Sequence, residues 1–269
     1  MGVGVTQELA ENGYKVYLYN RTPKNLDIAF ENFKKQLEKR VLKNKISKEK
    51  YDEIFGNITI TSDVEDAKYA DIVIESIVEN LESKMEMLKE IDKYCKDNTI
   101  ITSNTSSLSI TKLSTAVKNP ELFLGLHFFN PVYAMKLIEI IPGLQTGSEV
   151  VESMRVFGQT LNKEVVTVKD SAGFAVNRIL IPMINEAIIV YEHGVASIEE
   201  IDTAMKNGAN HPMGPLELAD YIGLDTVLAI MEALYQEFGV SKYYPAPLLK
   251  KYVEAGLLGV KTKEGFYKY

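Results

Sequence analysis

The chain has 269 residues, of which 46% are hydrophobic and 25% are charged, and it contains 17 glycines and 9 prolines. This composition excludes collagen-like, low-complexity and wholly disordered proteins, and the length allows one or two domains with a large core. The 30 lysines and arginines are outnumbered by 37 aspartates and glutamates, and the net charge of −7 argues against a general affinity for nucleic acid.

Membrane and secretion signals are not found in the sequence. No apolar run approaches the length of a membrane span, and the N-terminus lacks the basic and apolar regions of a secretory signal. The single cysteine, Cys95, excludes an internal disulfide and fits a reducing compartment. We therefore expect a cytoplasmic, soluble protein with no membrane partner.

Helices and strands alternate in the first part of the chain. Residues 3–12 predict a helix that ends at Gly13, a short strand follows at 15–19, and a long amphipathic helix covers 26–42. Further strands are predicted at 57–61, 71–77, 99–103, 122–129, 135–141 and 164–170, with helical patterns such as 81–95 between them. This alternation predicts an α/β fold with a mainly parallel sheet covered on both faces.

The pattern changes near residue 170. From about residue 175 to 255 the sequence shows helical periodicity interrupted by glycine and proline, and no convincing strand. We therefore predict two domains, an α/β domain over 1–172 and an all-α domain over 173–269.

Two glycines at the start of the chain suggest a nucleotide site. Gly2 and Gly4 precede the first predicted helix, and the strand after that helix ends at Asn20. In dinucleotide-binding folds, glycines at the first strand–helix turn let the backbone approach the pyrophosphate, which then lies at the helix N-terminus. The complete G-x-G-x-x-G pattern and the strand before it do not occur in this sequence.

The strongest candidates for chemistry lie at the ends of predicted strands. Ser106, His127, Asn130 and Glu139 offer a hydroxyl, an imidazole, an amide and a carboxylate there, and strand ends face the ligand crevice in open α/β sheets. His127 lies in an apolar run and has the alternative reading of a buried core histidine. Glu139 favours the functional reading, because a carboxylate in an apolar strand is costly unless it is paired. A His–Glu pair would suit a general base.

Other polar residues have weaker signals. Asn177 opens the first helix of the second domain, where it either meets a ligand or serves helix capping and junction packing. Lys35, Lys39 and Lys43 form a stripe on the helix at 26–42 and beyond, which is either a solvated face or a site for the phosphates of a small anion. The three histidines and one cysteine do not have the spacing of a metal site.

Several long segments together resemble one enzyme family. NTSSLSIT, GLHFFNPV, MKLIEII, GFAVNRILIPMINEA and GANHPMGPLELADYIGLD, in this order, are similar to motifs of the 3-hydroxyacyl-CoA dehydrogenase family, with its bacterial 3-hydroxybutyryl-CoA branch as the nearest match. The resemblance covers essentially the whole chain. It implies a Rossmann-type first domain, a helical second domain that dimerises, and NAD(P)-linked interconversion of a short (S)-3-hydroxyacyl-CoA and its 3-ketoacyl-CoA.

The resemblance also assigns roles to residues. It implies that His127 is the base, that Glu139 orients it, and that Ser106 and Asn177 hold the reacting end of the substrate. The remaining positions fall in two groups, which are Gly2, Glu75, Glu79 and Asn104 for the cofactor, and Lys39, Lys43, Ser106 and Asn130 for the CoA thioester.

Two features depart from the family pattern. Asn20 stands where NAD-preferring relatives carry an acid, and Arg21 follows it, so we expect NADP to be used at least as well as NAD. The first strand and the first glycines of the family are missing before Met1, from which we expect either a start further upstream or a truncated product. The sequence leaves two alternatives, a dehydrogenase of a free hydroxy acid and an inactive, N-terminally truncated dimeric homologue.

Overall fold

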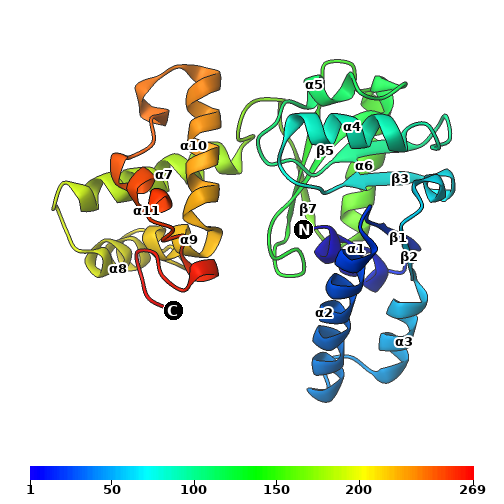
Figure 1. The fold of residues 1–269 in the computed structure, drawn as a ribbon, viewed down its shortest axis with the longest axis horizontal. Coiled ribbons are helices and arrows are strands. Elements are labelled where there is room, and N and C mark those ends of the chain that lie inside the picture. The colour runs from blue at the N-terminus through cyan, green and yellow to red at the C-terminus, as the bar shows by residue number, and fades with distance from the viewer. The chain divides into compact units, whose positions relative to one another are not determined.

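The structure is a computed structural model of residues 1–269, and it describes all of them except the side chains at positions 23, 25, 27, 29 and 36. The chain divides into two compact units, Met1–Asp170 and Ser171–Tyr269. Figure 1 shows that the first unit contains the strands and that the second is built from helices. The predicted boundary between residues 172 and 173 falls next to this division.

Seven strands of the first unit form two sheets. β1 (Val16–Tyr19) and β2 (Ile58–Thr61) pair with each other in parallel. The other sheet has the order β3-β4-β5-β6-β7, with β3 at Ile72–Glu75, β4 at Ile100–Ser103, β5 at Phe123–Phe128, β6 at Leu137–Pro142 and β7 at Glu164–Thr167. Its pairs are parallel except for β5 with β6, which is antiparallel. The prediction of a mainly parallel sheet is confirmed, but among the described strands β1 and β2 are not hydrogen-bonded to the other five.

Helices of the first unit flank these strands. They are α1 (Gly2–Glu11), α2 (Pro23–Leu42), α3 (Lys48–Gly56), α4 (Leu81–Ile91), α5 (Ile110–Ser114) and α6 (Ser148–Thr160), with short 3₁₀ turns at Val64–Tyr69 and Pro120–Leu122. α4 ends at Ile91, before the predicted end at residue 95. Asp92 is instead bound to a distant segment, because the Lys118 amide donates to its carboxylate and the Lys118 ammonium donates to its backbone carbonyl. That carbonyl would otherwise accept the next hydrogen bond of the helix.

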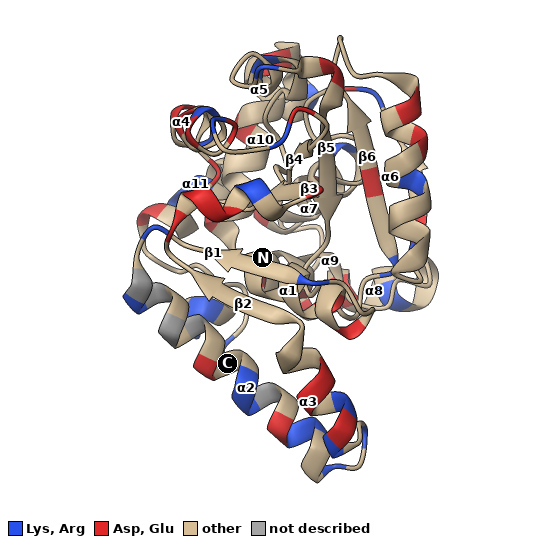
Figure 2. Ribbon diagram, turned by 90° about the vertical axis from the view of Figure 1, so that its right-hand side faces the viewer, with Lys and Arg blue, Asp and Glu red and all other residues tan. Residues whose placement is uncertain are grey.

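Two cores hold the first unit together. One lies between α1, α6 and the strands β5 and β6, where Val5, Leu126, Ile138 and Met154 are buried. The other packs α1 against α2 and α3 through Ala10 and a cluster of aromatic and aliphatic side chains. α2 and α3 extend from the β1–β2 pair as a helical arm, which both views show (Figures 1 and 2).

The second unit is all-helical, as predicted. It contains α7 (Val176–Glu192), α8 (Ile198–Gly208), α9 (Pro215–Ile222), α10 (Leu224–Phe238) and α11 (Pro247–Glu254), with 3₁₀ turns at Ser241–Tyr243 and Val260–Thr262. Its core is a single cluster of aliphatic residues closed by Phe266 of the C-terminal segment. None of the helices, so far as their residues are described, is long and apolar enough to cross a membrane.

Two buried carboxylates fasten the loops and the C-terminal segment of the second unit. Asp202 accepts hydrogen bonds from the amides of Leu216 and Glu217 and from the Tyr267 hydroxyl. Asp220 accepts from the amides of Phe266 and Tyr267 and from the Tyr269 hydroxyl. Each carboxylate therefore has several donors, which compensates the cost of burying it.

Candidate active site

A buried histidine–glutamate pair lies on the antiparallel strands β5 and β6. His127 and Glu139 are direct partners in the strand register, so their side chains leave the same face of the sheet next to each other. His127 Nδ1 lies 2.8 Å from Glu139 Oε2, and the residues are 3% and 0% exposed. A carboxylate that accepts the Nδ1 proton leaves Nε2 as the nitrogen that can receive another proton.

Ser106 lies on the open side of this imidazole. Its hydroxyl oxygen is 3.2 Å from His127 Nε2, and the residue belongs to the loop that follows β4. The structure therefore brings together three of the four residues predicted to be catalytic, Ser106, His127 and Glu139. This arrangement can take up and return a proton at Nε2 while Glu139 balances the charge of the imidazolium.

The fourth predicted residue, Asn177, lies in the other compact unit. It is half-buried in the first turn of α7. Its part in the reaction stays a prediction, which substitution and kinetics can test.

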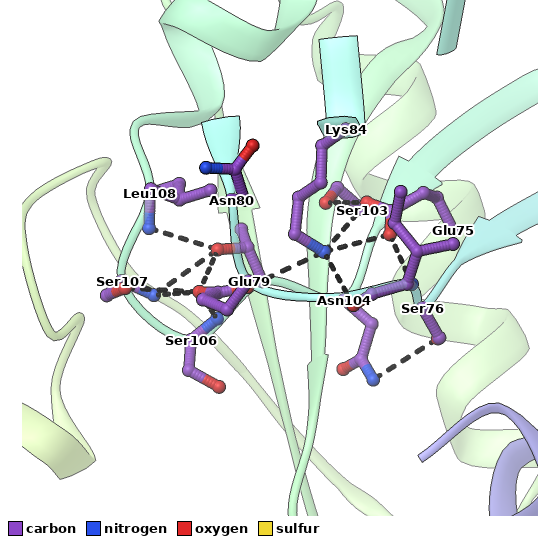
Figure 3. Close-up of polar contacts among 12 residues, drawn as sticks. Glu75, Ser76, Glu79, Asn80, Lys84, Ser103, Asn104, Ser106, Ser107 and Leu108 are labelled. Atoms are coloured by element: carbon purple, nitrogen blue, oxygen red, sulfur yellow. Dashed lines mark hydrogen bonds and ion pairs between the residues drawn. The ribbon is translucent and has the colours of Figure 1, made fainter. Parts of the chain in front are cut away.

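The loop that carries Ser106 is held by one carboxylate. Glu79 Oε1 accepts hydrogen bonds from the amides of Ser106 and Ser107, at 2.8 and 3.0 Å. It also accepts from the hydroxyls of Thr105 and Ser107, at 2.6 and 3.1 Å. Figure 3 shows the carboxylate pointing into the curve of the loop. Glu79 thus fixes the backbone of Ser106, and its side chain stays 38% exposed.

Glu75 is buried beneath this loop and is used internally. It ends β3, and its carboxylate accepts hydrogen bonds from Lys84 Nζ, the Ile77 amide and the Ser103 hydroxyl. Its side chain is 2% exposed. Glu75, which was predicted to meet the cofactor, is therefore buried and paired within the domain, whereas the Glu79 side chain is partly exposed.

Asn104 joins the ends of three neighbouring strands. Its backbone amide donates to the Glu75 carbonyl, its side-chain oxygen accepts from the Phe128 amide at 2.8 Å, and its side-chain nitrogen donates to the Ser76 hydroxyl. These contacts tie the carboxyl ends of β3, β4 and β5 together, at the edge where open α/β sheets bind ligands.

The N-terminus of α1 comes to the same edge. A Cβ atom at Gly2 would lie 3.8 Å from Ser76 Cβ, and one at Gly4 would lie 3.1 Å from a methyl group of Val132. The first amides of α1, as at any helix N-terminus, have no carbonyl partner within the helix and can act as donors to a ligand. These residues fit a dinucleotide, because helix amides and a close backbone approach are what its pyrophosphate requires.

The residues after β1 have partners of their own. Asn20 Oδ1 accepts a hydrogen bond from the Thr22 amide at 2.8 Å. Arg21 Nη2 lies 3.0 Å from Glu90 Oε2 of α4, with side chains 60% and 40% exposed. Arg21 is therefore at the surface, held by a pair that water screens.

Of the residues predicted to meet CoA, Ser106 lies beside His127 and the other three lie at the surface. Lys39 of α2 and Lys43, directly after the end of α2, are exposed, and their neighbour Arg40 turns instead to Glu11 of α1. Figure 2 shows acidic residues (red) as well as basic residues (blue) along α2. Asn130 is exposed after β5 and precedes Pro131 through a cis peptide bond.

Sequence reasoning missed Lys84, Ser103 and Thr105 in this region. Glu75 could have indicated that a lysine lies nearby, because a carboxylate at the end of a buried strand is costly unless a cation pairs with it. Where side chains are described, no group of three or more histidine, cysteine, aspartate or glutamate residues could hold a metal ion.

Comparisons with known proteins give the family. The family model for the NAD binding domain of 3-hydroxyacyl-CoA dehydrogenase matches residues 1–171, and the model for the C-terminal domain of the same enzyme matches residues 173–269. The chain belongs to the 3-hydroxyacyl-CoA dehydrogenase family.

The relatives match this chain over its full length. A 3-hydroxybutyryl-CoA dehydrogenase of Clostridioides difficile is 49% identical over all of this chain and 96% of the relative. A probable 3-hydroxybutyryl-CoA dehydrogenase of Bacillus subtilis is 46% identical over all of this chain and 94% of the relative. The crystal structure of (S)-3-hydroxybutyryl-CoA dehydrogenase from Ralstonia eutropha superimposes with a TM-score of 0.96 at 45% identity, covering 100% of this chain and 95% of that one.

Membership of the 3-hydroxyacyl-CoA dehydrogenase family confirms the main expectations. The first unit is a Rossmann-type NAD-binding domain, the second is the family's helical C-terminal domain, and the protein is an oxidoreductase. His127, Glu139, Ser106, Glu79 and Asn104 all lie in the NAD-binding domain.

Proposed function

We propose that this enzyme interconverts (S)-3-hydroxybutyryl-CoA and acetoacetyl-CoA by hydride transfer with NAD(H) or NADP(H). The observation that carries the proposal is the buried His127–Glu139 pair with the Ser106 hydroxyl on the Nε2 atom of the imidazole, in a chain whose relatives are named for this reaction. A bound nicotinamide supplies the hydride acceptor or donor.

His127 moves the proton in this scheme. During oxidation Nε2 takes the proton of the substrate hydroxyl, and during reduction it returns that proton to the carbonyl oxygen. Glu139 stabilises the imidazolium in between, and its burial strengthens this interaction because little water screens it. Ser106 and Asn177 orient the substrate oxygen, which brings the reacting carbon into line.

The carboxyl edge of β3, β4 and β5 would hold the cofactor in this proposal. Gly2 lies at the pyrophosphate, Glu79 and Asn104 line the nicotinamide and ribose pocket, and Glu75 supports that pocket from beneath. These placements are supported by the nearness of Gly2 to Ser76 and by the contacts of Asn104.

The first experiment measures oxidation of NADH and of NADPH by the purified protein with acetoacetyl-CoA, and in parallel with free acetoacetate. We expect turnover with the thioester and little with the free acid. Turnover of free acetoacetate at an equal kcat/KM would favour a hydroxy-acid dehydrogenase instead. His127→Ala is the matched inactive control.

We also propose that NADPH is used at least as well as NADH. Asn20 places no negative charge beside a 2′-phosphate, and Arg21 can turn to it by leaving Glu90, since such exposed pairs contribute about 0–1 kcal/mol. Arg21→Ala is expected to lower kcat/KM for NADPH and to leave that for NADH nearly unchanged. Glu90→Gln is expected to raise kcat/KM for NADPH. A strong preference of the unmodified enzyme for NADH would contradict this proposal.

The exposed Lys39 and Lys43 are proposed to bind the phosphates of CoA, with Asn130 near the thioester. Replacing Lys39 and Lys43 together with alanine is expected to raise KM for acetoacetyl-CoA about tenfold, in keeping with charge-assisted bonds to phosphate. KM for acetoacetyl-pantetheine, which lacks those phosphates, stays unchanged. The control replaces Lys48 and Lys50 of the neighbouring helix α3, which removes the same charge. An equal loss with both substrates would contradict a phosphate site.

The family resemblance and the composition support the remaining proposals, a cytoplasmic enzyme that forms a homodimer through its helical unit and needs neither nucleic acid nor membrane. In that unit Ile179 and Val195 are 74% and 72% exposed, and they are candidates for side chains that a second copy would cover in this proposal.

A further inference from the structure

A lysine ammonium is buried between two glutamates behind the loop that carries Ser106. Lys84 of α4 is fully buried, and its Nζ donates to both oxygens of Glu75, at 2.8 and 3.1 Å. It also lies 3.4 Å from the Ile77 carbonyl and 3.5 Å from Glu79 Oε2. Figure 3 shows the ammonium lying between the two carboxylates.

The charges in this cluster do not cancel, because one ammonium serves two carboxylates. Glu75 has two donors besides Lys84, because it also accepts hydrogen bonds from the Ser103 hydroxyl and the Ile77 amide. Glu79 has its Oε1 turned to the loop and its Oε2 turned to Lys84. Removing the ammonium would leave Glu79 beside a buried negative charge, and like charges at such distances repel strongly.

The contacts from Lys84 to the reacting histidine are continuous. Lys84 attracts Glu79, Glu79 accepts the amides of Ser106 and Ser107, and the Ser106 hydroxyl meets His127 Nε2. Each link is a hydrogen bond or an ion pair between named atoms. The orientation of Ser106 therefore depends on where the Glu79 carboxylate is held.

We propose that Lys84 is a positioning residue of the redox site, which acts through Glu79 to hold Ser106 against His127. The kinetic consequences of this inference rest on the proposed function. The contacts themselves can be tested by a measurement that does not need enzyme activity. A role in stability alone is the competing explanation, because any buried ammonium paired with a carboxylate affects folding.

Two variants separate positioning from stability. Lys84→Met leaves Glu75 charged and buried, so it loses both stability and positioning. Lys84→Met combined with Glu75→Gln makes the buried core neutral, because the glutamine oxygen can still accept from the Ile77 amide while its NH2 group donates to the Ser103 hydroxyl oxygen. We expect this double variant to recover most of the melting temperature of the unmodified protein and to keep a kcat about tenfold or more below it. Recovery of kcat together with the melting temperature would overturn the proposal.

Ser106 provides the second readout. If Lys84 acts through Ser106, the double variant costs much less in kcat/KM when it is combined with Ser106→Ala, because residues that act as a unit are not additive. Equal fold-losses with and without Ser106→Ala would show that Lys84 acts by another route, and would refute the proposal.

Amide hydrogen exchange tests the contacts independently of activity. The amides of Ser106 and Ser107 both donate to Glu79, so their exchange is expected to be about tenfold faster in the double variant. The Phe128 amide, which donates to Asn104, serves as the internal reference. Unchanged exchange at Ser106 and Ser107 would overturn the positioning role. An unmodified enzyme that turns over neither cofactor would refute the proposed function, and the exchange result would then decide on Lys84 alone.

Discussion

Glu139 makes the strongest residue-scale prediction, because it has no exposed surface and its charge is directed at one imidazole nitrogen. Glu139→Gln keeps the shape and can still accept the Nδ1 proton, but it removes the charge that balances the imidazolium. We expect kcat with acetoacetyl-CoA to fall about 100-fold, the lower range of general acid–base contributions, with the fold retained. Steady-state kinetics and circular dichroism measure the two effects. Glu86→Gln, on the exposed face of α4, is the control, and a kcat within twofold of the unmodified enzyme for Glu139→Gln would contradict the assignment.

Cys95 gives a residue-scale prediction that depends on pH. Burial and the nearby Asp92 carboxylate raise the pKa of this thiol to about 11. The thiolate is the reactive form, so the rate of alkylation by iodoacetamide should rise about tenfold per pH unit from pH 7 to 10. Intact mass measured over time gives the alkylation rate. The control is the unfolded protein in urea, whose alkylation rate should stop rising above about pH 8.5, the pKa of an ordinary thiol. The same levelling in the folded protein would contradict a raised pKa.

At the scale of elements, Asp220 makes more hydrogen bonds to the C-terminal segment than Asp202 does. Asp220 accepts from two backbone amides and one hydroxyl of residues 266–269. Asp220→Asn replaces an acceptor by a donor that faces other donors, so we expect the second unit to lose about 1–3 kcal/mol of unfolding free energy. Urea unfolding followed by tyrosine fluorescence measures the loss. Asp225→Asn, an exposed residue paired with Lys261, makes the same chemical change and should have a small effect; equal losses for both would contradict the anchoring role.

Element patterns explain which parts of the fold were predictable. The short β-branched runs predicted all seven strands, because strand periodicity and composition are local properties. The predicted end of α4 was too late, because the hydrogen bonds from Lys118 to Asp92 come from a distant segment and leave no local sequence signal. Glu139 was linked to His127 because an apolar strand tolerates a carboxylate only with a partner. Lys84 was missed, because a helical pattern does not show which of its lysines turns inward toward a strand end.

At the scale of the whole molecule, the proposed homodimer makes a prediction about mass. We expect a solution mass of about 60 kDa, twice the 30.2 kDa of one chain, because pairing would cover side chains such as Ile179 and Val195. Light scattering coupled to size-exclusion chromatography measures this mass. Ile179→Lys is expected to shift the equilibrium toward the monomer, with Lys250→Glu on α11 as the charge control. A monomeric unmodified protein at micromolar concentration would contradict the prediction.

The first unit has one helix that belongs to two cores. α1 buries Val5 against the strands of the catalytic sheet and Ala10 against the helical arm of α2 and α3, while the β1–β2 pair shares no ladder with that sheet among the described strands. The helical arm that would hold CoA therefore packs directly against α1, the helix whose N-terminus would hold the nucleotide. Thermodynamic linkage then makes their occupancies reciprocal, so that whatever affinity the nucleotide gains from bound CoA, CoA gains equally from the bound nucleotide.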